Sequence, residues 1–495
     1  MGKVLAIGLA IILITHIPIA VIADDSQSGE SQTQDIRTWE WVEQVGDSIY
    51  GSIVGKAIAV DSDGNAYVTG YFNGIASFGS QISLTSSGDY DIFVAKLDNN
   101  NTWVWATQAG GSHDDRGQDI AIDLSGNIYV TGRSASDATF GSLNQLPDGS
   151  DFVAKLDNSG NWQWVVRCSG CYSSSQGITI DTNANIYFTG NLRENITFGP
   201  IILSSPDTDI YVTKLNSSGV WQWAVKAGGT SWDYAYGISS DTFGNTYVTG
   251  KFRGEITFGS INLTSNGSSD IFVAKIDSNG MWQWAVKAGG TGPDLANGIA
   301  VDSSGNSYVT GFFEGIANFG SINLTSNGYN DIFVFKLDTN GTWQWAVRTG
   351  GDWHDLTDSG RGIAVDLDGN TYVTGRFVMN ATFGLTTLTN ETHKDLFVAK
   401  LDNMGNWEWA IQGGDNFTIS DGIAVDSGGN TYVTGRMEVP QSSWKYTLVI
   451  AKISGDSDGV VEPEPEIKGD SMPSFEFILC IIATLGATLF VSRRD

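Results

Sequence analysis

Short runs in which apolar and polar residues alternate recur along the chain, and Gly, Asn or Asp bounds each run. Examples are Gly298-Ile-Ala-Val-Asp302 and the two runs within 331–351, DIFVFKLD and TWQWAVRTGG, which TNG separates. Alternation with a period of two residues is typical of β-strands, and Gly, Asn and Asp favour the tight turns that join them. The pattern therefore predicts a chain built from β-hairpins.

A ten-residue motif, D-x-x-[GA]-N-x-Y-[VF]-T-G, occurs seven times, and consecutive copies start 58 to 64 residues apart. A short alternating run precedes each motif, and a second strand pair follows it after a link of about 20 residues. Each repeat therefore predicts a unit of four strands. The copies start at Asp61, Asp123, Asp181, Asp241, Asp302, Asp366 and Asp426.

The two ends of the repeat array predict how the units are arranged. A four-stranded unit of this size cannot bury both of its faces alone, and radial stacking as in a β-propeller solves this. The outer-strand signature W-x-W follows six of the motifs, whereas a seventh copy, Trp39/Trp41, precedes the first motif. The last motif is followed only by a third strand, 449–452. We expect residues 37–46 to supply the missing strand and to close an all-β, seven-bladed propeller, with the tryptophans packed between blades.

The coupling of G-N-x-Y-V-T-G, D-x-F-V-A-K and a tryptophan strand resembles the SBBP-type β-propeller repeat of exported bacterial and archaeal surface proteins. The resemblance covers residues 37–454. It implies the propeller fold, but it implies no particular activity, because propellers support unrelated functions.

Composition agrees with a strand-rich fold and constrains the partners. The chain has 61 glycines, 17 tryptophans and 16 tyrosines, and only 17% of its residues are charged. Acidic residues number 55 against 27 Lys and Arg, which gives a formal net charge of −28. Nucleic-acid binding needs basic patches that neutralise phosphate, so we expect no nucleic-acid partner.

Both ends of the chain predict export and attachment to a membrane. Residues 1–23 have a lysine, an apolar stretch and small residues before two aspartates, which is typical of a secretory signal peptide, with a retained N-terminal anchor as the alternative. A short polar segment, 24–36, leads into the propeller. An acidic, Pro-containing linker, 455–472, precedes the segment 473–495, which contains an apolar stretch, 475–491, followed by two arginines. This last segment resembles the PGF-type sorting signals of archaeal surface proteins, although Ser474 stands where that motif has Gly, and it predicts a transmembrane anchor at the cell surface.

Three kinds of residue predict modifications or metal binding. Cys168 and Cys171 form a C-x-x-C pair, which in an exported chain favours a local disulfide over a zinc half-site. Ten N-x-[ST] sequons make glycosylation of exposed turns plausible. The D-x-x-G-N turns favour a structural role, because the Gly and Glu positions of an EF-hand loop are absent. Weak calcium binding stays an alternative at Asp61, Asp63, Asp366 and Asp368, and no other cofactor is expected.

The segments that join the fourth strand of one repeat to the next repeat differ from unit to unit, and loops of this kind carry function. Their aromatic and acidic residues are the candidate ligand-binding residues. The set comprises Tyr50, His113, Asp115, Trp232, Asp233, Tyr234, Trp353, His354 and Asp355. The same segments also contain Tyr236 and Asp294. Ordinary loop variability is the alternative explanation.

Three functions stay open at this point. No nucleophile elbow, metalloprotease, phosphate-loop or dinucleotide motif occurs, so no catalytic residue is assigned. We favour a membrane-tethered, non-catalytic module that binds an extracellular glycan or protein. The alternatives are an extracellular carbohydrate-active hydrolase or lyase that uses loop carboxylates, and a structural surface-layer component.

Overall fold

In the computed structural model, the described residues are 37–46, 51–143, 150–170, 176–352, 358–390, 394–413, 417–438 and 445–455. Their 35 strands pair antiparallel, and they contain no helix, which confirms the all-β prediction. A membrane-spanning helix is therefore not found within these ranges. The described residues all belong to one compact unit. The predicted signal peptide and C-terminal anchor lie outside the described residues.

Four strands recur in each repeat. The first strands are β2 (Ser52–Val60), β8 (Arg116–Ile122), β13 (Gly177–Ile180), β17 (Tyr234–Ser240), β23 (Leu295–Val301), β27 (Ser359–Val365) and β33 (Phe417–Val425). The second strands are β3 (Ala66–Asn73), β9 (Ile128–Ser134), β14 (Ile186–Phe198), β18 (Thr246–Phe252), β24 (Ser307–Phe319), β28 (Thr371–Phe377) and β34 (Thr431–Glu438). The third strands are β6 (Asp91–Leu97), β11 (Ser150–Leu156), β15 (Ile201–Leu215), β21 (Asp270–Ile276), β25 (Ile322–Leu337), β31 (Asp395–Leu401) and β35 (Tyr446–Ile453). The fourth strands are β7 (Trp103–Gly110), β12 (Trp162–Arg167), β16 (Trp221–Gly229), β22 (Trp282–Gly290), β26 (Trp343–Thr349), β32 (Trp407–Gln412) and β1 (Trp39–Val45).

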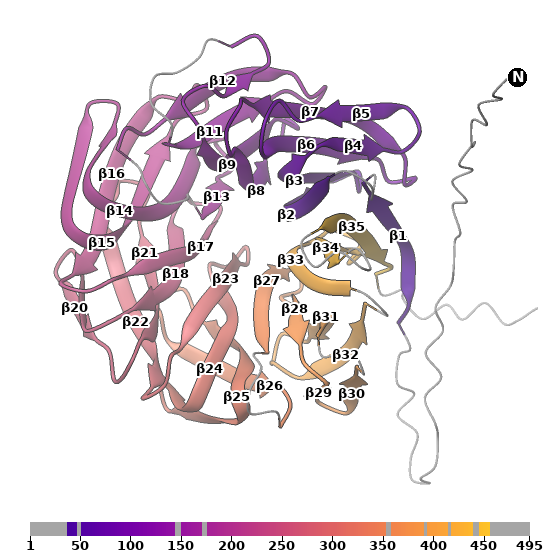
Figure 1. Cartoon of the computed structure of the whole chain (residues 1–495). Helices are drawn as coiled ribbons and strands as arrows, with labels where there is room; N and C mark the ends of the chain where they lie inside the picture. Colours follow the sequence, from indigo (N-terminus) through magenta and orange to yellow (C-terminus); the bar gives the residue numbers. More distant parts are fainter. Residues whose placement is uncertain are drawn as a thin grey trace, which may run out of the picture. The chain divides into compact units, whose positions relative to one another are not determined.

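Within a repeat the strands pair in chain order, from the first strand to the fourth, as in β2-β3-β6-β7. The first strands of successive repeats contact one another, from β2 to β8 and onward through β13, β17, β23 and β27 to β33. β33 in turn contacts β2. Figure 1 shows the first strands facing a common centre, with the fourth strands on the outside.

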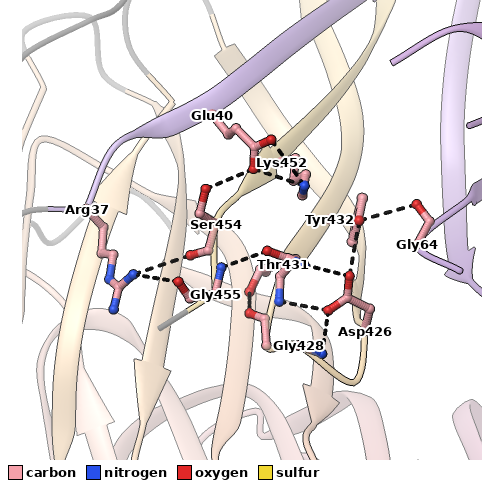
Figure 2. A network of polar contacts seen from close by, with 12 residues as sticks. Arg37, Glu40, Gly64, Asp426, Gly428, Thr431, Tyr432, Lys452, Ser454 and Gly455 are labelled. Carbon is pink, nitrogen blue, oxygen red and sulfur yellow. Dashed lines mark hydrogen bonds and ion pairs between the residues drawn. The ribbon is translucent and has the colours of Figure 1, made fainter. Parts of the chain in front are cut away.

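The last sheet joins the two ends of the described chain. β1 pairs antiparallel with β35, with Val42 opposite Ala451 and Gln44 opposite Val449, in the order β33-β34-β35-β1. Polar contacts reinforce this pairing (Figure 2): Lys452 Nζ lies 3.0 Å from Glu40 Oε2, and Arg37 Nη1 donates to the carbonyl oxygen of Gly455 at 3.0 Å. The strand at 39–45 thus occupies the place that the tryptophan pattern predicts for it.

The link between the second and third strands is more ordered than the sequence suggests. It folds into a hairpin, seen as β4 (Ile75–Phe78) with β5 (Ile82–Thr85), β19 (Glu255–Phe258) with β20 (Ile261–Thr264), and β29 (Asn380–Phe383) with β30 (Thr386–Thr389). The single strand β10 (Thr139–Phe140) and extensions of β14, β15, β24 and β25 take the same place elsewhere. Three of these hairpin strands, β10, β19 and β24, pair with the fourth strand of the preceding repeat. The links therefore connect neighbouring sheets rather than opening freely into solvent.

The tryptophan pairs pack between repeats, as predicted. The first tryptophan of a pair meets a hairpin phenylalanine edge-on, as in Trp103 and Phe78, whose ring centroids are 5.0 Å apart. The second lies against the tyrosine of its own motif and the turn of the next repeat. Trp105, for example, lies 6.3 Å from Tyr67 and donates its indole N–H to the carbonyl oxygen of Asn158 at 3.0 Å. Each pair therefore holds its own sheet and ties it to the next.

Candidate functional site

A cavity of about 340 Å³ lies among the first strands. Residues of β2, β8, β17, β23, β27 and β33 line it, together with Gln176 and Gly177 at the start of β13. All the repeats thus contribute to one channel.

A recurrent irregularity of the first strands supplies the polar lining. In six of them the register with the second strand skips one residue, for example Lys56 between Gly55 and Ala57. A β-bulge of this kind leaves one residue out of the ladder and re-aims its side chain. The seven channel residues, namely the six skipped ones and Gln176, which directly precedes β13, are Lys56, Gln118, Gln176, Tyr236, Asn297, Arg361 and Asp421.

The channel residues differ from repeat to repeat, although the residues after them hardly change. The segments after Asn297, Arg361 and Asp421 all read G-I-A-V-D, yet the three preceding side chains are an amide, a cation and an anion. Packing between the first strands explains the constant part: a Cβ on Gly237 would lie 3.1 Å from the backbone nitrogen of Ile299. The backbone and the packing of the first strands are therefore repeated, and the side chain that faces the channel varies.

Three cations surround one carboxylate at one side of the channel. Arg361 Nη1 lies 2.6 Å from Asp421 Oδ1, and Lys56 Nζ lies 3.7 Å from the same oxygen. Arg436, from β34, places Nη1 at 3.7 Å from Asp421 Oδ2. Burial alone would raise the pKa of Asp421, but these three cations outweigh it and lower the pKa, so the carboxylate stays ionised.

A second channel carboxylate has the opposite environment. Asp119, from β8, accepts backbone N–H groups of Ile178 at 2.8 Å and of Ile120 at 2.9 Å. Part of its surface meets solvent, but the channel walls enclose the carboxylate closely. Burial raises its pKa to about 7, even though both hydrogen bonds favour the charged form. Five of the other repeats have Gly at the corresponding position and one has Ala57.

Two of the predicted loop carboxylates are buried and hold backbone. Asp115 accepts the N–H groups of Gly111 at 2.8 Å and of Ala135 at 2.6 Å. Asp233 accepts the N–H of Arg253 at 3.2 Å. Both side chains have no exposed area, and burial raises the pKa of Asp115 to about 6 and that of Asp233 to about 7. These carboxylates hold the backbone at the entry into the first strand, and ligand binding by them stays a prediction.

Of the other predicted loop residues, the structure describes three, and their surroundings differ. Trp232 is 63% exposed, and His113, also exposed, has Nδ1 3.1 Å from Asp137 Oδ1. Tyr234 alone approaches the channel: its ring stacks on that of Tyr236, with the centroids 6.2 Å apart. The remaining candidates, Tyr50, Trp353, His354 and Asp355, lie outside the described residues.

Among the channel residues, the sequence pattern had drawn attention only to Tyr236. A usable signal for the others was present. It is the position directly before the near-constant G-I-x-x-D run, where charge and size change in almost every repeat.

The candidate calcium aspartates act as turn residues. Asp61 Oδ1 accepts the backbone N–H groups of Asp63 and Asn65, and Oδ2 accepts the side chains of Asn65 and Tyr67, all at 2.8 to 3.0 Å. Asp366 makes the corresponding bonds in its own repeat. No group of three His, Cys, Asp or Glu suited to a metal ion occurs in the described part of the chain. Calcium binding by these aspartates, or by Asp63 and Asp368, stays a prediction.

Cys168 is buried and disulfide-bonded. Cys171 lies outside the described residues, so pairing between these two cysteines stays a prediction.

The comparison with protein families matches the repeats seen in the structure. The profile of the SBBP β-propeller repeat matches residues 40–78, 104–137, 283–311 and 344–376. The chain contains SBBP β-propeller repeats. The first match starts in β1 and runs through β3 to the end of β4.

Two curated proteins resemble this SBBP-repeat chain. An uncharacterised WD repeat-containing protein of Acanthamoeba polyphaga mimivirus is 26% identical over 472 residues, which is 77% of this chain and 34% of that protein. The regulatory protein FlaEY of Caulobacter vibrioides is 26% identical over 289 residues, 52% of this chain and 30% of that protein. The chain thus spans about a third of each relative. Among solved structures, an ulvan lyase of a polysaccharide lyase family matches with a TM-score of 0.42 and 12% identity, over 83% of this chain and 96% of that one.

Proposed function

We propose that residues 37–455 form a closed seven-bladed β-propeller that is exported, is tethered to the membrane by its C-terminal segment, and binds an extracellular glycan in the channel. The contact of β33 with β2 and the pairing of β1 with β35 support closure. The hydrophobic character of 1–23 and 473–495 supports export and tethering.

The channel residues carry the proposal of binding. Seven equivalent positions, at or just before the first strands, present side chains that include amides, a phenol, two cations and an anion. A structural role alone would favour equivalent side chains at equivalent positions. Amide and phenol groups such as those of Gln118, Asn297 and Tyr236 are suited to the hydroxyl groups and ring faces of sugars. The cavity of about 340 Å³ is at the small end of ligand sites, so it suits a short stretch of glycan better than a folded protein.

A glycan array probed with the purified chain tests this function, followed by titration of the best ligand against variants. We expect Tyr236→Ala and Asn297→Ala each to weaken binding about tenfold, since each removes a half-buried side chain of the cavity lining that can hydrogen-bond or stack. Trp232→Ala, which changes an exposed aromatic residue outside the cavity lining, is the matched control and should bind as the parent does. Loss of binding in Trp232→Ala together with full binding by the channel variants would contradict a site in the channel.

A carbohydrate-active enzyme is the second candidate, and Asp119 is the observation that favours it. A carboxyl group with a pKa of about 7 is suited to general acid catalysis near neutral pH, and the second channel carboxylate, Asp421, stays ionised. Incubating the bound glycan with the chain distinguishes the two functions. Turnover that Asp119→Asn abolishes without loss of binding would replace the binding function with a catalytic one.

A further inference from the structure

The cations around Asp421 outnumber the negative charge available to them. Arg361 alone makes a hydrogen bond to Asp421, at 2.6 Å. Lys56 and Arg436 lie 3.7 Å from the carboxylate oxygens, which is too long for a hydrogen bond. Within the described residues, the Nε atoms of Arg361 and Arg436 also lack hydrogen-bond acceptors. One carboxylate therefore faces three positive side chains.

This local surplus of positive charge is opposite in sign to the net charge of the whole protein. The formal net charge is −28, so a site with more cations than anions is not a consequence of the composition. Asp421 alone would raise the pKa of Lys56, but burial and the charges of Arg361 and Arg436 outweigh it and lower that pKa. The cations repel one another, and a second anion in the cavity would relieve this repulsion.

The cations are also within reach of a ligand. Lys56, Arg361 and Asp421 line the cavity, and the side chains of Lys56 and Arg361 keep 23% and 28% of their surface exposed. The other polar side chains of the lining are Tyr236, three amides and the carboxyl group of Asp119, whose pKa burial raises to about 7. An ion pair that served only to join neighbouring repeats would need one cation for its carboxylate rather than three.

We propose that Lys56, Arg361 and Arg436 form an anion subsite of the channel, which takes the carboxylate of an acidic sugar while the neutral channel residues contact its hydroxyl groups. The proposal rests on the function proposed above and names its ligand class, a uronic-acid glycan. Arginine pairs with carboxylates in a planar, two-pronged geometry, and Lys56 supplies a further positive charge.

A pair of ligands that differ only in charge tests the subsite. Oligogalacturonate and its full methyl ester share one backbone, but the ester has no carboxylate. Titration calorimetry with the purified full chain should give an affinity for oligogalacturonate at least about tenfold above that for the ester, because hydrogen bonds to a charged group contribute more than neutral ones. Raising the salt concentration should weaken binding of the acid more than binding of the ester.

Variants locate the effect. Lys56→Gln and Arg361→Gln should lower the affinity for oligogalacturonate about tenfold and leave that for the ester nearly unchanged. Arg193→Gln, which removes an exposed cation that does not line the cavity, should change neither. Thermal unfolding of each variant checks the fold, and Lys56→Gln is informative even if Arg361→Gln is unstable, because Lys56 makes no hydrogen bond to Asp421.

Each outcome has a distinct meaning. Equal affinity for the acid and the ester would overturn the anion subsite and leave glycan binding in the channel standing. If neither oligomer binds, but a neutral glycan binds and Tyr236→Ala weakens its binding, the anion subsite is likewise overturned and glycan binding in the channel stands. If no glycan binds at all, both proposals fail.

Discussion

Replacing Trp41 by alanine tests whether the strand at the start of the propeller is a structural part of the last sheet. Trp41 is mostly buried, packs against the core that contains Phe72 and Leu448, and meets Tyr432 edge-on with centroids 6.4 Å apart. A free N-terminal segment would instead fray, as the ends of most domains do. Only a docked β1 makes this residue important for stability.

The magnitude follows from the buried area. A fully buried tryptophan side chain removes about 150–250 Å² from water, worth roughly 4–6 kcal/mol at about 25 cal/mol/Å². Because part of the Trp41 ring stays exposed, we expect Trp41→Ala to cost about 3 kcal/mol. With an unfolding entropy of about 2 cal/mol/K per residue over roughly 400 residues, this loss lowers Tm by about 3–4 °C.

Trp223 is the matched control, because it holds the same place in the fourth strand of the third repeat. It meets Tyr187 at 6.0 Å and donates its indole N–H to the carbonyl oxygen of Ser278 at 3.0 Å. Trp223→Ala should therefore cost about 1 kcal/mol more than Trp41→Ala. Differential scanning calorimetry compares the two variants. A Tm of Trp41→Ala equal to that of the parent, with a lowered Tm for Trp223→Ala, would refute the docking of β1 and the closure that depends on it.

Two further predictions concern stability. Gly320 and Gly315 both have positive φ, but a Cβ on Gly320 would lie 2.4 Å from Trp343 Cδ1, whereas a Cβ on Gly315 would meet open space. Gly320→Ala should therefore lower Tm clearly more than Gly315→Ala. Equal shifts of Tm would contradict a close contact between Gly320 and the tryptophan. Burial raises the pKa of Asp294 and Asp358 to about 7, while an unfolded aspartate titrates near 4. Between these values the folded state keeps protons that the unfolded state releases, so Tm should fall as the pH rises from about 4 to about 7, and a Tm that rises over this range would be contrary evidence.

The repeat frame could be predicted because it depends on local signals. The Asp of D-x-x-G-N forms the turn, and the tyrosine six residues later returns a hydrogen bond to the same carboxylate, as Tyr67 does to Asp61 at 3.0 Å. The place of β1 could be predicted because the W-x-W signature is distinctive. One copy precedes the first motif, and the last motif has no copy after it. The hairpins between the second and third strands could not, since strands such as ISLT in β5 are only four residues long, which is too short for alternation to be a clear signal. Their pairing partner is a neighbouring repeat, which alternation within one segment does not reveal.

The candidate site was harder to predict, because exposure of a loop carboxylate depends on packing. Asp115 and Asp233 follow glycine-rich strand ends in segments that look like surface loops. In the structure these carboxylates are buried and take up backbone N–H groups at the entry to a strand, as Asp115 does for Gly111 and Ala135. The channel residues sit within strands, where alternation predicts an ordinary ladder position. Only the one-residue bulge directs them into the cavity, and a bulge leaves the polar and apolar alternation almost unchanged.

Asp421 takes part both in the proposed binding site and in the contacts between repeats. The bulge removes the channel residues from the ladder, and the following G-I-x-x-D run makes contacts between first strands. Asn297 adds one more such contact, since its side-chain amide donates to the carbonyl oxygen of Gly360 at 2.7 Å. Asp421 differs, since its carboxylate faces Arg361 of β27 and Lys56 of β2, on either side of β33. β33 belongs to the last repeat and β2 to the first, so Asp421 and Lys56 face each other across the junction of these repeats, whereas Arg361 lies in the sixth repeat. A ligand anion that bound these cations would therefore add an attraction between the repeats on both sides of that junction. Binding of an acidic glycan and the stability of the junction are, on this reasoning, coupled through one carboxylate.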